Sequence, residues 1–366
     1  MKKTAMWCCL PVFGIALLMG ASAARSAWAQ PTNGGKIVGG PYVVNATPTS
    51  ATLMWMVQTG EASHGFQWEH KAPALHAERI HMTGLQPGTV QNYQAFPGEA
   101  GKGSFKTPPV RTAPFEFVVY GDTRTRHDVH RAVIAGILKY SQPDFVVQTG
   151  DLVEDARDHA QWPIFFDAER ELLRKAAYYP ALGNHEFNAR NYYDFMEARS
   201  YYSFDWGSAH LIVLNSNIGS IGPDKIARDA EWEEQTRWLE ADLKNSQGAR
   251  FRFIFAHHPP MTAVKSRQGQ NQHMAALEPL FRKYRVAGAF FGHDHNYQHY
   301  WKEGIHYFVS GGGGAPLYDV DAPPAGITVK TAKTENFMVV KVNGAKARVE
   351  VFKPNGEKLD SAELGN

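Results

Sequence analysis

Five short polar motifs, each directly after an apolar run, restrict the fold of this chain more than any other feature. The runs are rich in Phe, Val, Ile and Tyr, as is typical of buried β-strands. Because α/β sheets bind ligands at the carboxyl ends of their strands, we expect the motifs to meet at one edge of a sheet. They are Gly121-Asp122-Thr123-Arg124, Gly150-Asp151-Leu152-Val153-Glu154, Gly183-Asn184-His185-Glu186, His257-His258-Pro259-Pro260 and Gly292-His293-Asp294-His295.

Between these motifs, predicted strands alternate with predicted helices. Residues 115–120 are expected to form a strand, and residues 127–140 a helix with Val129, Val133 and Ile137 on one face. A second helix is predicted over residues 229–243, and β-structure returns after Gly304. This alternation predicts an α/β domain over residues 114–366.

The preceding residues, 36–109, show short alternating segments and no helical periodicity. Leu53, Trp55 and Val57 alternate along one such segment, and Pro87-Gly88 marks a turn. We therefore predict a small all-β sandwich, joined to the α/β domain through Pro108-Pro109.

The first 29 residues have the pattern of a secretory signal peptide. Lys2 and Lys3 precede an apolar run over residues 6–19, and Ala27-Trp28-Ala29 provides an A-x-A cleavage site. The alternative is a membrane anchor, but the run is shorter than the ~20 apolar residues of a spanning helix. We expect an exported protein that is periplasmic or secreted and has no membrane span after cleavage.

Cleavage would change both the cysteine content and the charge. Cys8 and Cys9 would be removed, so the mature chain would have no cysteine and no disulfide. Removing Lys2, Lys3 and Arg25 from the 38 basic residues leaves 35 against 36 acidic residues. No basic block remains that would predict a nucleic-acid-binding or membrane surface.

The residue types in the five motifs suit metal ions. Hard cations prefer carboxylates, amide oxygens and neutral imidazoles. This mixture is supplied by Asp122, Asp151, Asn184, His257, His293 and His295. We predict a two-metal site in which Asp151 bridges the ions, a shared hydroxide attacks a phosphoryl group in line, and His185 assists the leaving group. His257 is preferred as a ligand over His258, and that choice stays open.

With these motifs, the chain resembles the calcineurin-like metallophosphoesterases. The run Gly292-His293-Asp294-His295-Asn296-Tyr297-Gln298 and the N-terminal β-region are most similar to purple acid phosphatases and their bacterial relatives. The resemblance implies an αββα sandwich and two metal ions, expected from among Fe, Zn and Mn. It places Asp122, Asp151 and His295 on metal one. It places Asp151, Asn184, His257 and His293 on metal two.

The N-terminal region also resembles a fibronectin type III domain. The resemblance rests on Ser50-Ala51-Thr52-Leu53-Met54-Trp55 and Leu85-Gln86-Pro87-Gly88-Thr89. One position departs from that pattern, because Gln91 stands where the corner tyrosine is expected and Tyr93 lies two residues later.

Two positions depart from the phosphatase pattern. Arg124 stands where many members of the family have a metal-binding histidine, and Glu154 where purple acid phosphatases have a ligating tyrosine. Either Glu154 completes metal one, or that ion binds with more water. The guanidinium of Arg124 suits a phosphate oxygen, so we predict that Arg124 holds substrate.

The sequence therefore predicts a metal-dependent phosphoric ester hydrolase acting on a small phosphate ester. Monoesters are preferred because of the N-terminal resemblance, with diesters as the alternative. A non-catalytic binding protein with a decayed phosphatase domain is the competing class. The glycine run Gly311–Gly314 lacks the Lys-Ser/Thr of a P-loop and is predicted to form a tight turn.

Overall fold

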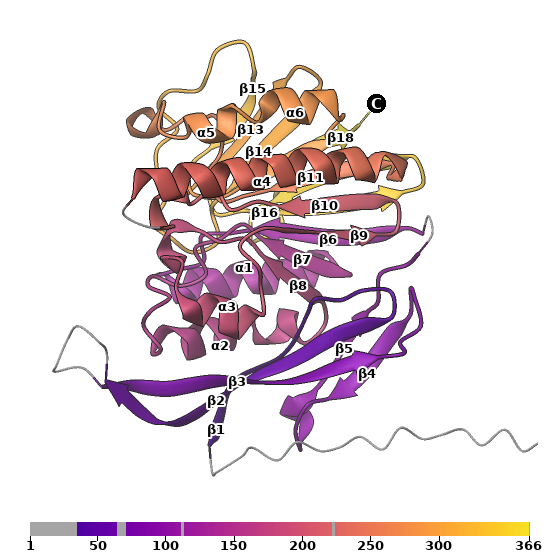
Figure 1. Ribbon diagram of the computed structural model, residues 1–366, viewed down its shortest axis with the longest axis vertical. Coiled ribbons are helices and arrows are strands. Elements are labelled where there is room, and N and C mark those ends of the chain that lie inside the picture. The colour runs from indigo at the N-terminus through magenta and orange to yellow at the C-terminus, as the bar shows by residue number, and fades with distance from the viewer. Residues whose placement is uncertain (1–34, 64–70, 111–112, 222–223, 366) are drawn as a thin grey trace, which may run out of the picture.

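Two β-sheets packed face to face form the centre of the protein, with helices on both outer faces (Figure 1). The computed structural model describes residues 35–63, 71–110, 113–221 and 224–365. The expected signal peptide over residues 1–29 lies outside them, as do Cys8 and Cys9. Among the described residues, no helix is both long and apolar enough to cross a bilayer.

The first sheet has nine strands in the order β18-β17-β16-β6-β7-β8-β1-β2-β3. The strands β6, β7 and β8 are parallel neighbours, so their carboxyl ends lie at one edge. The bounds are β1 Lys36–Val44, β2 Ser50–Ser63, β3 Lys71–Thr83, β6 Phe115–Tyr120, β7 Phe145–Gln148, β8 Ala177–Pro180, β16 Phe337–Asn343, β17 Lys346–Phe352 and β18 Lys358–Leu364.

The second sheet has seven strands in the order β15-β13-β14-β12-β11-β10-β9. Here β10, β11, β12 and β14 are parallel. The bounds are β9 Tyr202–Trp206, β10 Ala209–Val213, β11 Phe251–Phe255, β12 Gly288–Phe291, β13 Tyr297–Lys302, β14 Ile305–Ser310 and β15 Thr328–Ala332. A separate hairpin-like pair consists of β4 Val90–Gln94 and β5 Lys102–Lys106.

The helices divide between the outer faces of the two sheets (Figure 1). On the first sheet lie α1 His127–Tyr140, α2 Gln161–Leu173 and α3 Arg190–Met196. On the second lie α4 Lys225–Asn245, α5 Gln272–Ala275 and α6 Glu278–Lys283. The predicted helix over residues 127–140 is confirmed, and the one predicted over 229–243 extends at both ends.

Alternation along the strands explains why both faces of each sheet are buried. In β6, Phe117 and Val119 point between the sheets, whereas Val118 and Tyr120 pack under α1 and α2. In β11, Phe253 contacts the inner core and Ile254 packs with α4 and α6. Such strands must be apolar on both sides, which is why they are continuous apolar runs in the sequence. The predicted αββα fold is confirmed.

The N-terminal strands do not confirm the fibronectin type III-like prediction. Strand β1 pairs in parallel with β8 at Val43 and Ala177, so β1–β3 continue the first sheet of the α/β domain. The outer face of β1 is covered by α2, where Gly39 lies against the Phe166 ring. The described part of residues 36–109 has five strands, fewer than the seven of an immunoglobulin-type sandwich. Helix α2 therefore covers the face of β1 that a second sheet would cover in a complete sandwich.

Candidate metal centre

The five predicted motifs meet at one end of the two sheets. Asp122, Asp151 and Asn184 lie in the loops after β6, β7 and β8 of the first sheet. His257 and His293 lie after β11 and β12 of the second sheet. Because these strands are parallel within each sheet, their carboxyl ends bring the loops together across the inner core.

The first group of converging donor atoms contains Asp122, Asp151 and His295. Their ligand atoms lie within 4.8 Å of one another, and all three side chains are buried. His295 Nε2 is 3.4 Å from Asp122 Oδ1, and its Nδ1 donates to the Pro316 carbonyl at 2.8 Å. The Nε2 atom of His295 is thereby left to face the carboxylates. These three residues are the ligands that the sequence resemblance placed on metal one.

The second group lies beside the first and shares Asp151 with it. Asn184 Oδ1 is 3.0 Å from both His257 Nε2 and His293 Nδ1. His257 Nε2 is also 3.3 Å from Asp151 Oδ1, while its Nδ1 donates to the Thr149 carbonyl at 2.8 Å. The structure thus brings together the four residues predicted for metal two.

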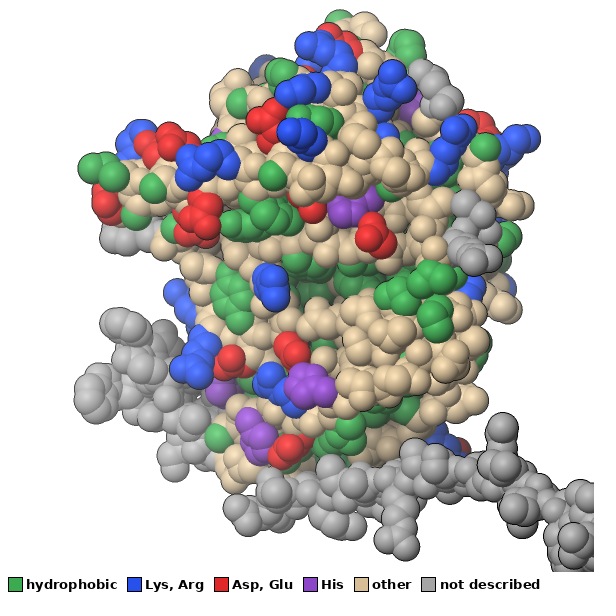
Figure 2. Space-filling view, turned by 45° about the vertical axis from the view of Figure 1, so that its right-hand side comes forward, with side chains coloured by type: hydrophobic (Ala, Val, Ile, Leu, Met, Phe, Trp, Pro, Cys, Tyr) green, Lys and Arg blue, Asp and Glu red, His purple; other side chains and the backbone are tan. Residues whose placement is uncertain are grey.

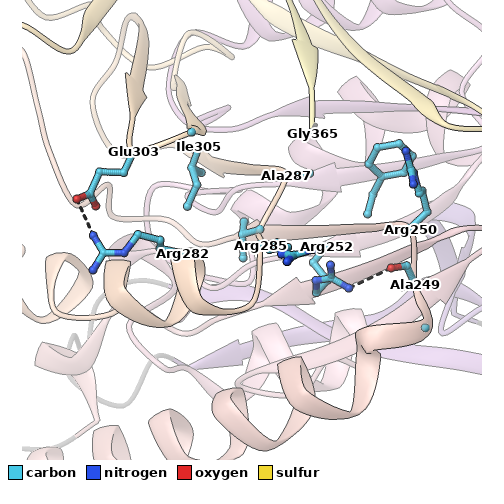
Figure 3. Close-up of a pocket in the computed structure, with 13 residues that line it drawn as sticks. Ala249, Arg250, Arg252, Arg282, Arg285, Ala287, Glu303, Ile305 and Gly365 are labelled. Atoms are coloured by element: carbon cyan, nitrogen blue, oxygen red, sulfur yellow. Dashed lines mark hydrogen bonds and ion pairs between the residues drawn. The ribbon is translucent and has the colours of Figure 1, made fainter.

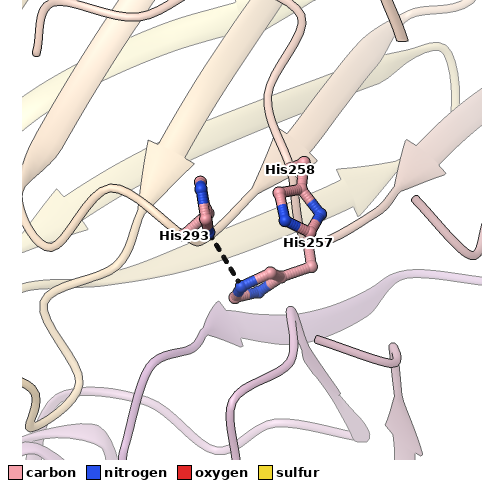
Figure 4. A group of neighbouring side chains, drawn as sticks. All are labelled: His257, His258 and His293. Atoms are coloured by element: carbon pink, nitrogen blue, oxygen red, sulfur yellow. Dashed lines mark hydrogen bonds between the residues drawn. The ribbon is translucent and has the colours of Figure 1, made fainter. Parts of the chain in front are cut away.

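His258 also belongs to this neighbourhood. The rings of His257, His258 and His293 lie close together in Figure 4, and one ligand atom of each lies within 4.8 Å of the others. His258 Nδ1 lies 3.0 Å from the Ser216 hydroxyl, which also accepts the backbone N–H of His258. Both neighbouring histidines therefore line the site, and the choice of His257 as the ligand stays a prediction.

The described donor set fits two hard cations. Asp122 and Asp151 are almost completely buried, and leaving both carboxylates there without cations is costly. Carbonyl groups orient His257 and His295 through Nδ1, as is usual for histidine ligands of metals. Carboxylates, an amide oxygen and imidazoles suit iron, zinc and manganese better than a soft cation.

For three side chains, the surroundings favour the protonation state that binds a metal ion. Burial raises the pKa of Asp151, but His257 and His185 outweigh it and hold that pKa below the usual value. Burial, together with the neighbouring His257, lowers the pKa of His258 well below its usual range. Burial also lowers the pKa of His293 well below its usual range. An ionised Asp151 and neutral His258 and His293 are the states that bind metal ions.

The backbone at the site is held in unusual conformations. Asp122, Asp151 and His293 have φ values of 60°, 55° and 70°, in the left-handed region that few non-glycine residues adopt. Such strain persists only where the surrounding structure imposes it, and it clusters at functional sites.

Close packing explains the glycines before Asp151, Asn184 and His293. A Cβ at Gly292 would lie 2.5 Å from Asp122 Oδ2, and one at Gly150 would lie 2.8 Å from His257 Nδ1. A Cβ at Gly183 would collide with Asp151 Oδ1. The run Gly311–Gly314 packs against the same loops, where Gly313 N donates to the Gly121 carbonyl. This run thus supports the Asp122 loop by packing.

The sequence alone predicts only that Glu186 is a supporting or surface group. The structure gives Glu186 a specific place behind the ligand loops. Its fully buried carboxylate accepts N–H groups from Asp151 at 2.8 Å, Leu152 at 2.9 Å and Gly183 at 2.7 Å. Burial and the charge of Asp151 raise the pKa of Glu186 to about 7. Glu186 therefore ties the loop of Asp151 to the loop of Asn184.

Arg124, Glu154 and His185 lie at the edge of the first group. Arg124 Nη1 donates to Glu154 Oε2, and Arg124 Nε is 3.5 Å from Asp151 Oδ2. His185 Nδ1 donates to the Glu154 carbonyl at 2.6 Å, and His185 Nε2 is 3.9 Å from Asp151 Oδ2. Glu154 thus contacts Arg124 and His185, and its role as a metal ligand stays a prediction.

Arg267 and Tyr318 are two further residues beside the site that the sequence did not single out. Arg267 Nη1 donates to the His293 carbonyl at 2.6 Å and to Asp294 Oδ1 at 3.1 Å. The Tyr318 ring stacks on His295 at 4.2 Å between centroids and is covered by the Arg267 guanidinium. Both lie far along the chain from the ligands that they support, so no local pattern could have found them.

Comparisons with known proteins agree with this geometry. Purple acid phosphatase 22 of Arabidopsis thaliana is 27% identical over 263 residues, which cover 66% of this chain and 57% of that protein. The chain thus spans little more than half the length of this relative. The yellow lupin purple acid phosphatase PPD1 has a similar fold, with a TM-score of 0.68, 17% identity, and coverage of 89% of this chain and 74% of that one.

A second solved structure, PhoD, has a similar fold, with a TM-score of 0.63 and 11% identity. It covers 91% of this chain and 94% of its own. The model of the calcineurin-like phosphoesterase family matches residues 115–297, half of the chain and all five motifs. The predicted resemblance to the calcineurin-like metallophosphoesterases is confirmed. The chain belongs to the calcineurin-like phosphoesterase family.

Proposed function

We propose that this protein is an exported, metal-dependent hydrolase of small phosphate monoesters. The observation that carries the proposal is the convergence of two donor groups on Asp151, with His185 Nε2 3.9 Å from its carboxylate. Preference for monoesters is supported by the similarity to a purple acid phosphatase. Export is supported by the signal-peptide pattern of residues 1–29 and implies a periplasmic or secreted enzyme.

Two metal ions would be held by the residues of the two groups. Asp122, Asp151 and His295 would hold the first ion. Asp151, Asn184, His257 and His293 would hold the second. Iron, zinc and manganese are the metals proposed. When bound, the ions would lower the pKa of water and neutralise charge on the phosphoryl group.

His185 would handle the proton of the leaving group. Because its Nδ1 donates to the Glu154 carbonyl, Nε2 is the atom that faces the substrate, and it carries a transferable proton when the ring is an imidazolium. Protonating the departing oxygen as its bond to phosphorus breaks is ordinary general acid catalysis. The His185 side chain is 19% exposed at the edge of the site, which is consistent with this role.

Arg124 would orient the phosphate group. Its guanidinium contacts Glu154 through Nη1, whereas no hydrogen bond from Nη2 is found within the described part of the chain. Arg124 Nε is buried and has no hydrogen-bond partner among the described residues, although Asp151 Oδ2 lies 3.5 Å away. A bound phosphate oxygen would satisfy these donors in the two-pronged geometry that guanidinium groups favour.

Hydrolysis of a chromogenic aryl monoester and of the matching diester tests the proposal. The full-length mature protein is assayed with added iron, zinc or manganese, beside the Asp151→Ala variant. We expect metal-dependent turnover that is faster on the monoester and lost in the variant. Faster turnover of the diester would make the protein a phosphodiesterase with the same site. No turnover by folded protein with any metal would favour a non-catalytic binding protein.

Export is tested separately, by fractionating producing cells and sequencing the amino terminus of the recovered protein. Recovery outside the cytoplasm with a start after Ala29 is expected. Recovery of the uncleaved chain from membranes would instead support an N-terminal anchor.

A further inference from the structure

A cavity lies at the opposite end of the second sheet from the metal centre. It has a volume of about 640 Å³ and opens where β11, β12 and β14 begin (Figure 3). Arg252 is the second residue of β11, and His257 follows the carboxyl end of that strand. At ~3.3 Å per residue, the two are roughly 17 Å apart along the chain, so the cavity and the metal centre are separate places.

The cavity is strongly cationic. Four arginines line it, namely Arg250, Arg252, Arg282 and Arg285, against the single carboxylate of Glu303. Glu303 is already engaged, since its Oε1 pairs with Arg282 Nη1 at 2.6 Å (Figure 3). Within residues 35–63, 71–110, 113–221 and 224–365, no carboxylate pairs with Arg250 or Arg285. The cavity therefore carries positive charge that the described residues do not neutralise.

Arg252 is the buried member of this set, with 6% of its surface exposed. Its Nε donates to the Tyr284 carbonyl at 2.7 Å, and its Nη1 donates to the carbonyls of Ser246 and Ala249, each at 3.0 Å. These bonds fix the guanidinium but leave Nη2 without a partner in the described structure. Burial lowers the pKa of Arg252, and the charge of Arg285 adds to this effect. A bound anion would relieve both the desolvation and the repulsion.

On the face shown in Figure 2, positive and negative side chains are interspersed over much of the surface. The arginine cavity differs from such a surface because three of its four arginines lack a carboxylate partner in the described chain. Unpaired guanidinium groups around a hollow are suited to the oxygens of a phosphate group, which each can meet with two parallel N–H donors. The volume is in the range of small-molecule sites, so the phosphate could belong to a larger ester.

We propose that the cavity bounded by Arg250, Arg252 and Arg285 binds a phosphate group, either free or as part of a small phosphate ester. The two exposed arginines, Arg250 and Arg285, bind the oxygens, and Arg252 supplies a fixed charge at the base. This site does not depend on the metal ions or on the proposed activity. It lies instead at the start of β11 and β12, whose carboxyl ends lead to His257 and His293.

Equilibrium dialysis of the full-length, metal-loaded protein against radiolabelled inorganic phosphate tests this proposal. A second arm uses labelled glycerol phosphate with the inactive Asp151→Asn variant, so that the ester is not consumed. In the Asp151→Asn background, where phosphate binding at the metal centre is impaired, we expect one saturable site per chain that weakens at least tenfold when Arg250→Ala/Arg285→Ala is added. Tighter binding of the ester than of inorganic phosphate would identify a phosphorylated molecule as the ligand.

The matched control is Arg190→Ala/Arg237→Ala, which removes two exposed arginines that form i,i+4 ion pairs on α3 and α4. It should bind phosphate as the wild type does. The proposal is overturned if, in the Asp151→Asn background, the cavity variant binds like this control, if Asp151→Asn abolishes all binding, or if the wild type shows no saturable site. The proposed phosphatase activity can fail without affecting any of these outcomes.

Discussion

The carboxylate of Glu186 accepts the backbone N–H of Asp151 at 2.8 Å, which places a buried acid directly behind the shared residue of the metal centre. The same carboxylate accepts the N–H groups of Leu152 and Gly183. A glutamine cannot accept all three, because its amide nitrogen would face an N–H donor. We expect Glu186→Gln to lower metal affinity about 10–100-fold, as is typical when a group supporting metal ligands is changed.

Metal content after dialysis, measured by mass spectrometry, checks this expectation. Glu171→Gln on the exposed surface of α2 is the control, because within the described part of the chain its carboxylate pairs with Arg174 alone. Equal metal retention by both variants would mean that the loops hold their positions without Glu186.

Arg124→Ala should weaken phosphate recognition while leaving the metal content intact. The guanidinium contacts Glu154 and lies 3.5 Å from Asp151, but it cannot itself bind a cation. We expect kcat/KM for an aryl monoester to fall about 10–100-fold, since charge-assisted hydrogen bonds to phosphate are strong. Arg131→Ala, which removes an exposed ion pair with Asp167 on α1 and α2, serves as the control. Unchanged kinetics in Arg124→Ala would refute the substrate-binding role.

His185→Asn should slow hydrolysis most for substrates with poor leaving groups. An alkoxide needs a proton as it departs, whereas a nitrophenolate does not. We expect a loss of about 10²–10⁴-fold on an alkyl phosphate and a much smaller loss on nitrophenyl phosphate. Rates on the two substrates with each protein provide the comparison. A uniform loss on both would indicate that His185 orients neighbouring groups and does not transfer the proton.

Gly292→Ala should impair the metal centre through a steric clash. The added Cβ would lie 2.5 Å from Asp122 Oδ2, closer than real Cβ atoms approach such a group. Gly219→Ala is a matched control, because its Cβ would meet nothing within 4 Å. We expect lower metal content and activity in the first variant and wild-type values in the second. Normal metal content in Gly292→Ala would show that the Asp122 loop can move aside.

His210 should make stability depend on pH at a place remote from the metal centre. Burial lowers its pKa, but hydrogen bonds to Asp205 at 2.7 Å and Asp242 at 2.8 Å raise it to about 9. The folded-state pKa exceeds the usual ~6.5, so the stabilisation is complete below that pH and disappears as the pH rises through about 9. We expect His210→Gln to cost about 1–2 kcal/mol at pH 6, discounted because Asp205 is largely exposed.

Urea unfolding at pH 6 and pH 10 measures the effect of His210→Gln. The difference from wild type should shrink at the higher pH, whereas His76→Gln, at a side chain that is 40% exposed, should change little at either. An equal loss at both pH values would mean that His210 contributes by packing alone.

The sequence by itself determined the α/β core and pointed to the candidate metal ligands, but not to Arg267 and Tyr318 beside them. Strand, loop and ligand are neighbours in the chain at Asp122, Asp151 and Asn184, so local patterns were sufficient to find them. The same reasoning located His257, His293 and His295, because each follows an apolar run that could only be a buried strand.

Contacts between residues far apart in the chain were decided only by the tertiary structure. Strand β1 was expected in a separate sandwich, but burial against α2 and pairing with β8 placed it in the main sheet. The hydrogen bond between Glu186 and Asp151 links residues that are 35 positions apart in the chain. The arginine cavity is lined by segments that are distant in the chain and come together where the parallel strands begin. Local sequence encodes which surface a strand must bury, whereas the partner that covers it depends on the packing of the whole chain.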